Sequence, residues 1–555
     1  MTPLEKTLQT ALETMARTND TQARQIQSLT STVETLNETI AKMTSEQNKL
    51  LAYVEWLKRK VFGYSSERRM FIDSQPNLFD SAGVEIEGAA QTNDTISDEP
   101  EAQECDEAVV RKRKGAKGIS RGRLDISHLP VLETRVIEPE GGVDMSRYRR
   151  IGEEKTELLE HVPGKLGRIV IIRPKYGLID PTEPVERGQG VLIAPMPLLP
   201  VPKGIPASGL LTEILLGKYE YHMPFYRQLK QFAHLGTEGL KEATLVGWFR
   251  RSMELLRPLY NVLLKEIMKS DYIQADETTV PVMGKGRHHA EKEYLWMVRS
   301  VMEGLVAFHY DKGSRSGDVI KELTEKYNYK GYLQCDGFGG YERVFRGNAS
   351  IPMVNCMVHI RRYWEPALKE NRNEALWVLG KIRELYKVEK DCDMAGMDFE
   401  ARRRERLLRT KPIMDEMKSR LEEMAVRYSS KTLTGSAATY AYNRWDNMMR
   451  ILEDGRLLLD NNLGENEIRP ITLGRKNYLF CGNHDAASDM SVIASLLSTC
   501  RNHRVNPRLY LKNVIERMPY FLDATEEQIA ELLPHRWKLI HPEAVMTQTV
   551  RQLVK

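Results

Sequence analysis

Near the N-terminus, hydrophobic residues recur at alternating steps of three and four. This spacing is the a/d seam of a coiled coil, in which helices bury a shared apolar stripe. Gln47 interrupts the seam, and a polar seam residue can fix register at some cost in stability. We therefore predict that residues 1–68 form a coiled-coil helix that makes the protein a homo-oligomer. The alternative is a long amphipathic helix packed on its own chain. The seam positions are Ile26, Leu29, Val33, Leu36, Ile40, Met43, Gln47, Leu50, Val54, Leu57 and Val61.

The hydrophobic pattern stops after this helix. Residues 69–126 are rich in Ser, Asp, Glu, Gly and Gln, a composition that cannot bury enough apolar surface to fold. An acidic block is followed by a basic run that begins with Arg111, Lys112, Arg113 and Lys114. We predict a disordered, charged linker whose basic run contacts DNA phosphates. The alternative is a solvated linker in which the acidic block partly neutralises the basic run.

Apolar residues return in two further units. Residues 127–207 contain a strand pattern at 168–173 and then a crowd of prolines, which predicts a small β-rich module and an extended connector. Residues 208–268 have a helical period interrupted by a Gly-containing turn at 236–240. This order is typical of a helix-turn-helix DNA reader, although many helical hairpins bind nothing. We predict that 208–268 is helix-turn-helix-like.

From residue 269 the period changes to that of strands. Strand patterns at four places and one helical pattern predict a mixed sheet with a crossover connection. The strand patterns lie at 271–280, 294–300, 305–310 and 331–336, and the helical pattern lies at 314–327. The predicted fold class is therefore multidomain α+β. Its remaining parts are a core at 269–365, an α-helical insertion at 366–452, the completion of the core at 453–500 and a helical tail at 501–555.

Two acidic residues lie at the ends of apolar strands in this core. Asp276 and Asp336 would meet at one sheet edge if their strands are neighbours, and two carboxylates that close repel unless a cation lies between them. Hard oxygen ligands suit Mg²⁺ or Mn²⁺. A third carboxylate, Glu465, follows turn residues that can open a short helix, and Arg469 lies one helical turn further on, where it could hold a phosphate. Glu467 is expected to point away from the site, so that its loss is mild.

Other cations near these acids are candidates for contacts with DNA. Arg361 and Arg362 follow a predicted strand, whereas Arg475 and Lys476 follow Glu465 by about three turns of helix. Each could contact phosphates or could be a surface charge. The α-helical insertion at 366–452 could contact DNA or lock the active site, and the alternative is a packing element with a solvated basic face. One of its helices is rich in arginine. Its arginines are Arg402, Arg403, Arg404 and Arg406.

Composition sets limits on these predictions. Hydrophobic residues make up 41% of the chain and charged residues 28%, so large parts can bury a core. The formal net charge of +4 is too small to indicate a nucleic-acid partner by itself. The six Cys contain no CxxC pair, which excludes a simple disulfide scaffold or Cys-rich zinc site. No apolar run approaches the roughly 18 residues that a spanning helix needs, and no membrane partner is expected.

Several sequence blocks resemble the transposases of the IS66 family of insertion sequences. They are YIQADETTVPV at 272–282, GYLQCDGFGGY at 331–341, NCMVHIRRYW at 355–364 and LDNNLGENEIRPITLGRKNYLFCGN at 459–483. The resemblance implies a DDE transposase with a ribonuclease-H-like catalytic core. It places the triad on Asp276, Asp336 and Glu465, which would hold two Mg²⁺ (or Mn²⁺) ions. The family usually carries a zinc module with two Cys pairs, but no Cys lies between residues 105 and 335 here, so zinc is not expected and the 127–207 module is degenerate.

The resemblance also implies a function and its partners. Such a protein binds the ends of an insertion sequence and catalyses metal-dependent strand cleavage and strand transfer. Its partners would be the element ends, the target DNA, a second copy of the chain and small accessory proteins encoded by the same element. Its location would be the bacterial cytoplasm, at the nucleoid.

Two other functions fit the same sequence. A catalytically inactive or domesticated, DNA-binding oligomer of the family would look almost identical, although the presence of all three acids favours activity. A nuclease or resolvase on the same fold is the other alternative. The predicted coiled coil and the extra N-terminal units count against it, because they suit the pairing of two DNA ends.

Overall fold

The computed structural model describes Met15 and six longer stretches of the chain. These are residues 126–139, 145–162, 164–179, 191–237, 239–284 and 289–546. The predicted seam at 26–61 and the basic run that begins at Arg111 lie outside the described residues. Within the described residues, no helix has both the length and the apolar character needed to cross a bilayer.

A four-stranded sheet, dominated by one long hairpin, opens the folded part. Strands β2 (Tyr148–Val162) and β3 (Lys165–Leu178) pair antiparallel, and β3 carries a run of β-branched residues that suits a pleated strand. Strand β1 (Val131–Val136) runs parallel to β3, and β4 (Val191–Ile193) pairs antiparallel with the end of β3. The small core of this sheet contains Leu158, Ile169, Ile171 and Ala207.

Three helices follow the proline-rich segment: α2 (Ser208–Tyr219), α3 (Phe225–His234) and α4 (Glu242–Ile267). Helix α2 buries every residue except Lys218. Helix α4 buries an apolar face that starts at Leu245, and the glycine-containing turn lies between α3 and α4. These helices therefore belong to the main hydrophobic core rather than to a separate module.

The central element of the fold is a mixed five-stranded sheet with the order β7-β6-β5-β8-β9. Strand β6 runs antiparallel to β5 and β7, whereas β5, β8 and β9 are parallel. The strands are β5 (Tyr272–Met283), β6 (Ala290–Ser300), β7 (Val306–His309), β8 (Tyr332–Cys335) and β9 (Met353–Asn355). Helices α5 (Asp318–Lys326) and α6 (Gly339–Phe345) lie in the connections. The predicted mixed sheet with a crossover is thus confirmed.

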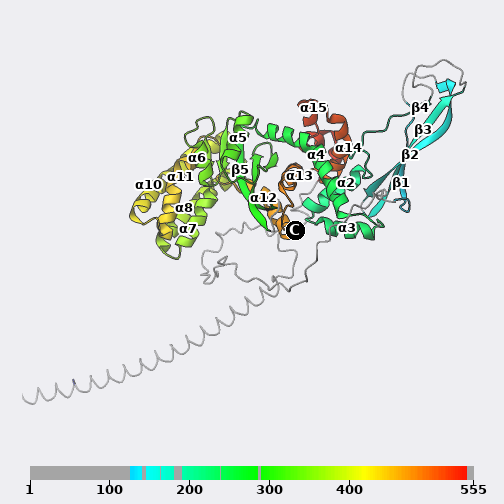
Figure 1. The fold of residues 1–555 in the computed structure, drawn as a ribbon. Helices are drawn as coiled ribbons and strands as arrows, with labels where there is room; N and C mark the ends of the chain where they lie inside the picture. Colours follow the sequence, from blue (N-terminus) through cyan, green and yellow to red (C-terminus); the bar gives the residue numbers. More distant parts are fainter. Residues whose placement is uncertain are drawn as a thin grey trace, which may run out of the picture. The chain divides into compact units, whose positions relative to one another are not determined.

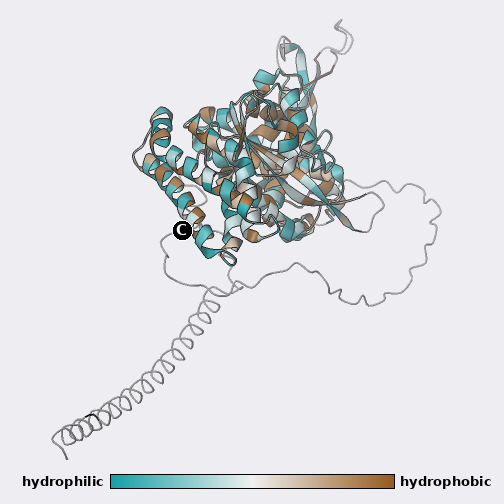
Figure 2. Cartoon of the chain, turned by 90° about the vertical axis from the view of Figure 1, so that its left-hand side faces the viewer, coloured by the Kyte–Doolittle hydropathy of each residue, from teal (hydrophilic) through white to brown (hydrophobic). Residues whose placement is uncertain are grey.

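A helical bundle is inserted between β9 and the last part of the core (Figure 1, yellow-green to yellow). Its helices are α7 (Met357–Ala367), α8 (Arg372–Met394), α9 (Phe399–Glu405), α10 (Lys411–Arg427) and α11 (Leu433–Met449). The bundle has a hydrophobic core of its own, in which Trp364 and Trp445 are fully buried. In Figure 2 hydrophobic and hydrophilic residues alternate along the helices, as expected for helices that bury one face.

The chain then returns to the sheet and ends in helices. Helix α12 (Asn462–Tyr478) packs on β5, and α13 (His484–Asn502) packs on β7, where Ser495 Oγ accepts a hydrogen bond from the Phe308 amide at 2.7 Å. Helix α12 has 17 residues and is therefore longer than the short helix that its turn residues predict. Helices α14 (Pro507–Arg517), α15 (Glu526–Ala530) and α16 (Pro534–Ile540) complete the fold.

Candidate active site

Two strand ends bring the first two carboxylates to one edge of the central sheet. Strands β5 and β8 are parallel neighbours, and their register pairs Gln274 with Gln334. Asp276 and Asp336 each lie two residues beyond this pair. Asp276 is on the strand face that carries Gln274, because side chains on a strand alternate with period two. Asp336 directly follows the last residue of β8, and its charge acts on Asp276. The neighbouring strands that the sequence argument required are therefore present.

These carboxylates repel one another in a buried setting. Burial, together with the charges of Asp336, Glu277 and Glu465, raises the pKa of Asp276 to about 8. The amide of Glu277 donates to Asp276 Oδ1 at 2.8 Å, which offsets part of the rise. The amide of Phe338 likewise donates to Asp336 Oδ1 at 2.9 Å. A cation placed among these oxygens would remove the repulsion.

Glu277 is a fourth acid at this edge, and the sequence argument missed it. Its side chain is 5% exposed and lies 3.2 Å from Arg315 Nη2. Burial and the charge of Asp336 raise the pKa of Glu277 to about 7, although Arg315 opposes the rise. The sequence signal was two consecutive acids, Asp276 and Glu277, in an apolar strand.

Glu465 reaches the same edge from the first turn of α12. Its Oε1 is buried and lacks a hydrogen-bond partner, and it lies 3.9 Å from His359 Nδ1. Its Oε2 lies 3.9 Å from Arg362 Nη2, an exposed guanidinium on α7. Burial lowers the pKa of His359, so the imidazole is neutral near pH 7. Glu465 is thus held close to cationic or neutral groups without being paired to any of them at hydrogen-bond distance.

Two buried glutamines hold the segment that carries Glu465. Gln274 Nε2 donates to Gln334 Oε1 at 2.8 Å, and Gln274 Oε1 accepts from the Gly464 amide at 3.0 Å. Gln334 Nε2 donates to the Leu458 carbonyl at 2.7 Å. Both glutamines are fully buried. The sequence signal is a repeated spacing, Gln-x-Asp, in both strands: the glutamine positions the third acid, and the aspartate that follows provides another.

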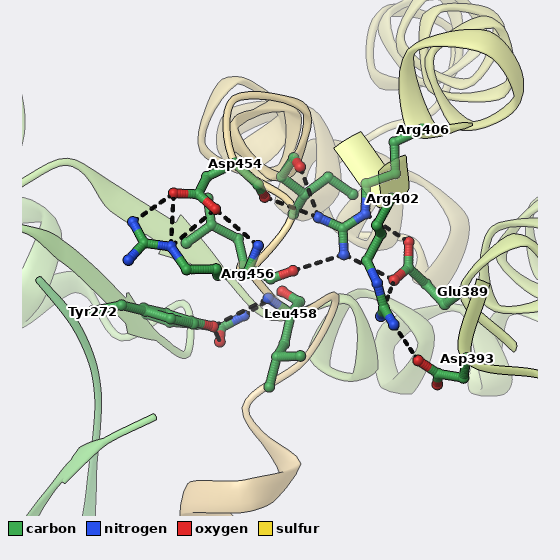
Figure 3. A network of polar contacts seen from close by, with 11 residues as sticks. Tyr272, Glu389, Asp393, Arg402, Arg406, Asp454, Arg456 and Leu458 are labelled. Atoms are coloured by element: carbon green, nitrogen blue, oxygen red, sulfur yellow. Dashed lines mark hydrogen bonds and ion pairs between the residues drawn. The ribbon is translucent and has the colours of Figure 1, made fainter. Parts of the chain in front are cut away.

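A fully buried arginine fixes the chain just before this segment (Figure 3). Arg406 donates to both carboxylate oxygens of Glu389 at 2.8 Å. It also donates to the carbonyls of Ile451, Asp454 and Leu457 at 2.8 to 3.0 Å. Because Arg406 is buried, it neither contacts DNA nor lies on a solvated basic face, and it acts as a packing residue of the insertion. That the insertion locks the active site stays a prediction. The sequence pattern predicted a charged helix, but it did not show that Arg406 is fully buried where the chain returns to the sheet.

The neighbouring arginines of this helix differ from Arg406. Arg402 forms ion pairs with Glu389 and Asp393, so its charge is also used within the bundle. Arg404 is exposed. The Arg403 side chain is 41% exposed and lies 3.8 Å from Glu400. Arg402 and Arg406 therefore form structural ion pairs, whereas Arg403 and Arg404 keep side chains that are open to solvent, as the sequence predicted.

The other predicted cations lie in different environments. Arg469 and Lys476 are exposed on α12, and Arg361 Nε donates to Glu365 at 3.0 Å on its own helix. Arg475 is half-buried and donates to the carbonyl and hydroxyl of Thr279 on β5, and burial lowers the pKa of Arg475. Arg475 therefore attaches α12 to the sheet. The run from Arg111 to Lys114 lies outside the described residues.

Glu467 is a structural residue and not a spare acid. It is 5% exposed, it forms an ion pair with the buried Arg299, and its Oε2 lies 3.9 Å from Arg501. This pairing agrees with the expectation that Glu467 points away from the site, and the mild effect of its loss on cleavage stays a prediction. The sequence did not show that its removal would leave a buried charge unpaired. Two acids of one helix thus differ: Glu465 has a carboxylate oxygen without a hydrogen-bond partner, whereas Glu467 forms an ion pair with a buried arginine.

Comparisons with known proteins cover nearly all of this chain. The profile described as "Transposase IS66 family" matches residues 203–489, a range that contains all three carboxylates. "IS66 C-terminal element" matches 495–535, and "Transposase C of IS166 homeodomain" matches 49–134. The chain is 28% identical to the uncharacterized protein y4jD of Sinorhizobium fredii (strain NBRC 101917 / NGR234), over 88% of this chain and 94% of that protein. It is also 28% identical to the uncharacterized protein y4qI of the same strain, over 94% of this chain and 93% of that protein.

Proposed function

Because this chain belongs to the IS66 family of transposases, we propose that it is a DDE-type enzyme that cleaves DNA at the ends of an insertion sequence and joins those ends to a target. The observation that carries the proposal is the convergence of Asp276, Asp336 and Glu465 at one edge of the sheet, with the pKa of Asp276 raised to about 8. The mixed five-stranded sheet, with acids at the ends of two adjacent parallel strands, supports a ribonuclease-H-like core.

The donor set fits hard divalent cations. Three carboxylates that repel one another are the oxygen ligands that Mg²⁺ and Mn²⁺ prefer. Asp276, Asp336 and Glu465 would hold two such ions, which when bound polarise the scissile phosphodiester and lower the pKa of water. The open Oε1 of Glu465 and the protonated state of Asp276 near neutral pH are the features that such binding would change.

The protein's own groups would position the DNA. Arg362 lies 3.9 Å from Glu465 with an exposed guanidinium, and Arg469 is exposed one helical turn from Glu465, so both can contact phosphate oxygens beside the carboxylates. Asp276 must give up its proton when a cation binds. Water is the first nucleophile and a DNA 3′-hydroxyl the second, and no covalent enzyme intermediate is needed.

The remaining parts of the proposal concern DNA ends and assembly. We propose that the basic run at Arg111–Lys114 and the α3–α4 unit contact the element ends, and that residues 1–68 pair two copies of the chain. Lys476, exposed on α12, is a further candidate for phosphate contact. Accessory proteins of the same element and a location at the bacterial nucleoid follow from the family and belong to this proposal.

Cleavage of a labelled DNA end tests the proposal. The full chain is expected to cut it with Mg²⁺ or Mn²⁺ and to stop when a chelator is added. Asp276→Asn and Asp336→Asn should each lower the rate about a thousandfold or more, because an amide keeps the shape of the ligand but not its charge. Glu322→Gln, an exposed acid on α5, is the matched control and should cut normally. Normal cutting by both Asn variants would overturn the proposal.

A further inference from the structure

Beside the carboxylate edge lies a cluster of three different donor atoms. Cys356 precedes the first residue of α7, His359 lies in the first turn of α7, and Glu465 comes from α12. The sulfur, one imidazole nitrogen and one carboxylate oxygen of these residues lie within 4.8 Å of one another. In the part of the chain that the structure describes, this is the one group of three such donors that lies so close together.

Two of these atoms are buried without a hydrogen-bond partner. They are His359 Nδ1 and Glu465 Oε1, which lie 3.9 Å apart, too far for a hydrogen bond between them. A buried polar atom without a partner destabilises the fold, so two such atoms that face each other are consistent with a ligand between them. Cys356 is 2% exposed, and its Sγ lies within 4.8 Å of the other two donor atoms.

We propose that Cys356, His359 and Glu465 form a second metal site, which binds Zn²⁺ and withdraws Glu465 from the carboxylate edge when it is filled. Sulfur and imidazole donors suit Zn²⁺ and Co²⁺, whereas the all-oxygen edge suits Mg²⁺ and Mn²⁺. The proposal of metal binding rests only on the arrangement of these three donors and does not depend on the proposed function. Its inhibitory effect on DNA cleavage rests on the proposed function, because it requires Glu465 to serve that reaction.

Burial raises the pKa of the Cys356 thiol to about 12, so only a bound metal would make it a thiolate, and two contacts would then stabilise that charge. The Asn461 amide donates to Cys356 Sγ at 3.3 Å, which is the kind of contact that stabilises a coordinating sulfur. Cys356 also lies at the N-terminal end of α7, where the helix dipole favours negative charge. Binding exchanges the thiol proton, which leaves to solvent, for the metal, and no electron is transferred. Tetrahedral zinc places its donors about 3.3–3.8 Å apart, so the side chains must close by roughly 1 Å.

Cobalt absorption tests binding in the full chain. Co²⁺ should give a thiolate-to-metal charge-transfer band and the d–d bands of a tetrahedral ion, and an excess of Zn²⁺ should remove both. Cys356→Ser should abolish the charge-transfer band, and His359→Gln should weaken Co²⁺ binding on the order of a hundredfold. Cys392→Ser, a buried cysteine of α8, is the matched control and should keep the band. His359→Gln tests the same site if Cys356→Ser fails to fold.

Two results would overturn the binding proposal. One is the absence of a charge-transfer band in the wild-type chain, and the other is a band that persists in folded Cys356→Ser. Zinc inhibition of Mg²⁺-dependent cleavage is measured separately, and His359→Gln should need about tenfold more Zn²⁺ for half-inhibition. If the wild-type chain cleaves DNA but gives no cobalt charge-transfer band, only the proposal of a second metal site is wrong. If the wild-type chain gives the cobalt band but does not cleave DNA, the proposed function is wrong and the proposed metal site is supported.

Discussion

Two regions of this protein bury charged side chains, but only one of them provides each buried charge with a partner. Around Arg406 every charge is matched: its five N–H donors have five acceptors, two on Glu389 and three on backbone carbonyls (Figure 3). At the carboxylate edge, burial and the charges of the neighbouring acids raise the pKa of Asp276 to about 8. Matched buried charge holds the scaffold, whereas unmatched buried charge marks the place where a ligand is to bind.

The same contrast recurs within two residues of α12. Glu467 has a buried arginine as its partner, and Glu465 has an oxygen with none. The two side chains have the same chemistry, so their difference is entirely one of surroundings. Variants that change charge but not shape can therefore separate the scaffold role from the site role.

The largest expected effect separates these two glutamates. Glu465→Gln should lower DNA cleavage about a thousandfold while leaving the unfolding midpoint unchanged or raised, because it removes a repelling charge. Glu467→Gln should retain most cleavage at low temperature but lower the free energy of unfolding by about 2–3 kcal/mol, because Arg299 loses its partner. Cleavage rates and urea unfolding of both variants decide the matter. If both variants lose cleavage and neither loses stability, the contrast between the two acids is wrong.

A second prediction concerns the arginine network alone. Arg406→Met should lower the free energy of unfolding by about 3–5 kcal/mol, because three buried carbonyls lose their donor and Glu389 keeps only Arg402 as a partner. Arg404→Met, on the exposed side of the same helix, should change it by about 0.5 kcal/mol or less. The measurement is urea unfolding followed by circular dichroism. Equal losses in the two variants would mean that Arg406 does not hold the returning chain.

The link between the two regions is tested at Gln274. Gln274→Leu removes the amide that binds Gln334 and Gly464, so the segment carrying Glu465 should lose its fixed position. We expect cleavage to fall about ten- to a hundredfold, with more Mg²⁺ needed for half-maximal rate. Cleavage is measured against Mg²⁺ concentration. An unchanged Mg²⁺ dependence would show that Gln274 contributes only to packing and does not position Glu465.

The smallest expected effect is a pH dependence of stability in the metal-free protein. Burial and mutual repulsion raise the pKa of Asp276 from 3.8 to about 8 and that of Glu277 from 4.5 to about 7. Between these values the folded chain binds more protons than the unfolded chain, so the free energy of unfolding falls as pH rises from about 4 to 8. The fall should reach at least about 1 kcal/mol, and Mg²⁺ should reduce it. Unfolding midpoints of wild type and Asp276→Asn with a chelator check the slope, which should be smaller in the variant.

Much of the site could be predicted from sequence because its signals are local. Asp276 and Asp336 stand out as charged residues at the ends of apolar strands, and a parallel pairing of those strands was enough to bring them together. The role of Arg406 could not be predicted, because three of its five acceptors are backbone carbonyls some 45 to 51 residues away in the chain. The ion pair of Glu467 could not be predicted for the same reason: its partner Arg299 is on another element.

Manganese binding by the full chain tests the central claim most directly. Electron paramagnetic resonance counts free Mn²⁺ as protein is added. We predict that the wild-type chain removes Mn²⁺ from solution and that Asp276→Asn and Asp336→Asn bind it at least about a hundredfold more weakly, while Glu322→Gln binds it as wild type does. Unchanged Mn²⁺ binding in both Asn variants would contradict the claim that the unmatched acids at this sheet edge are there to hold a divalent cation.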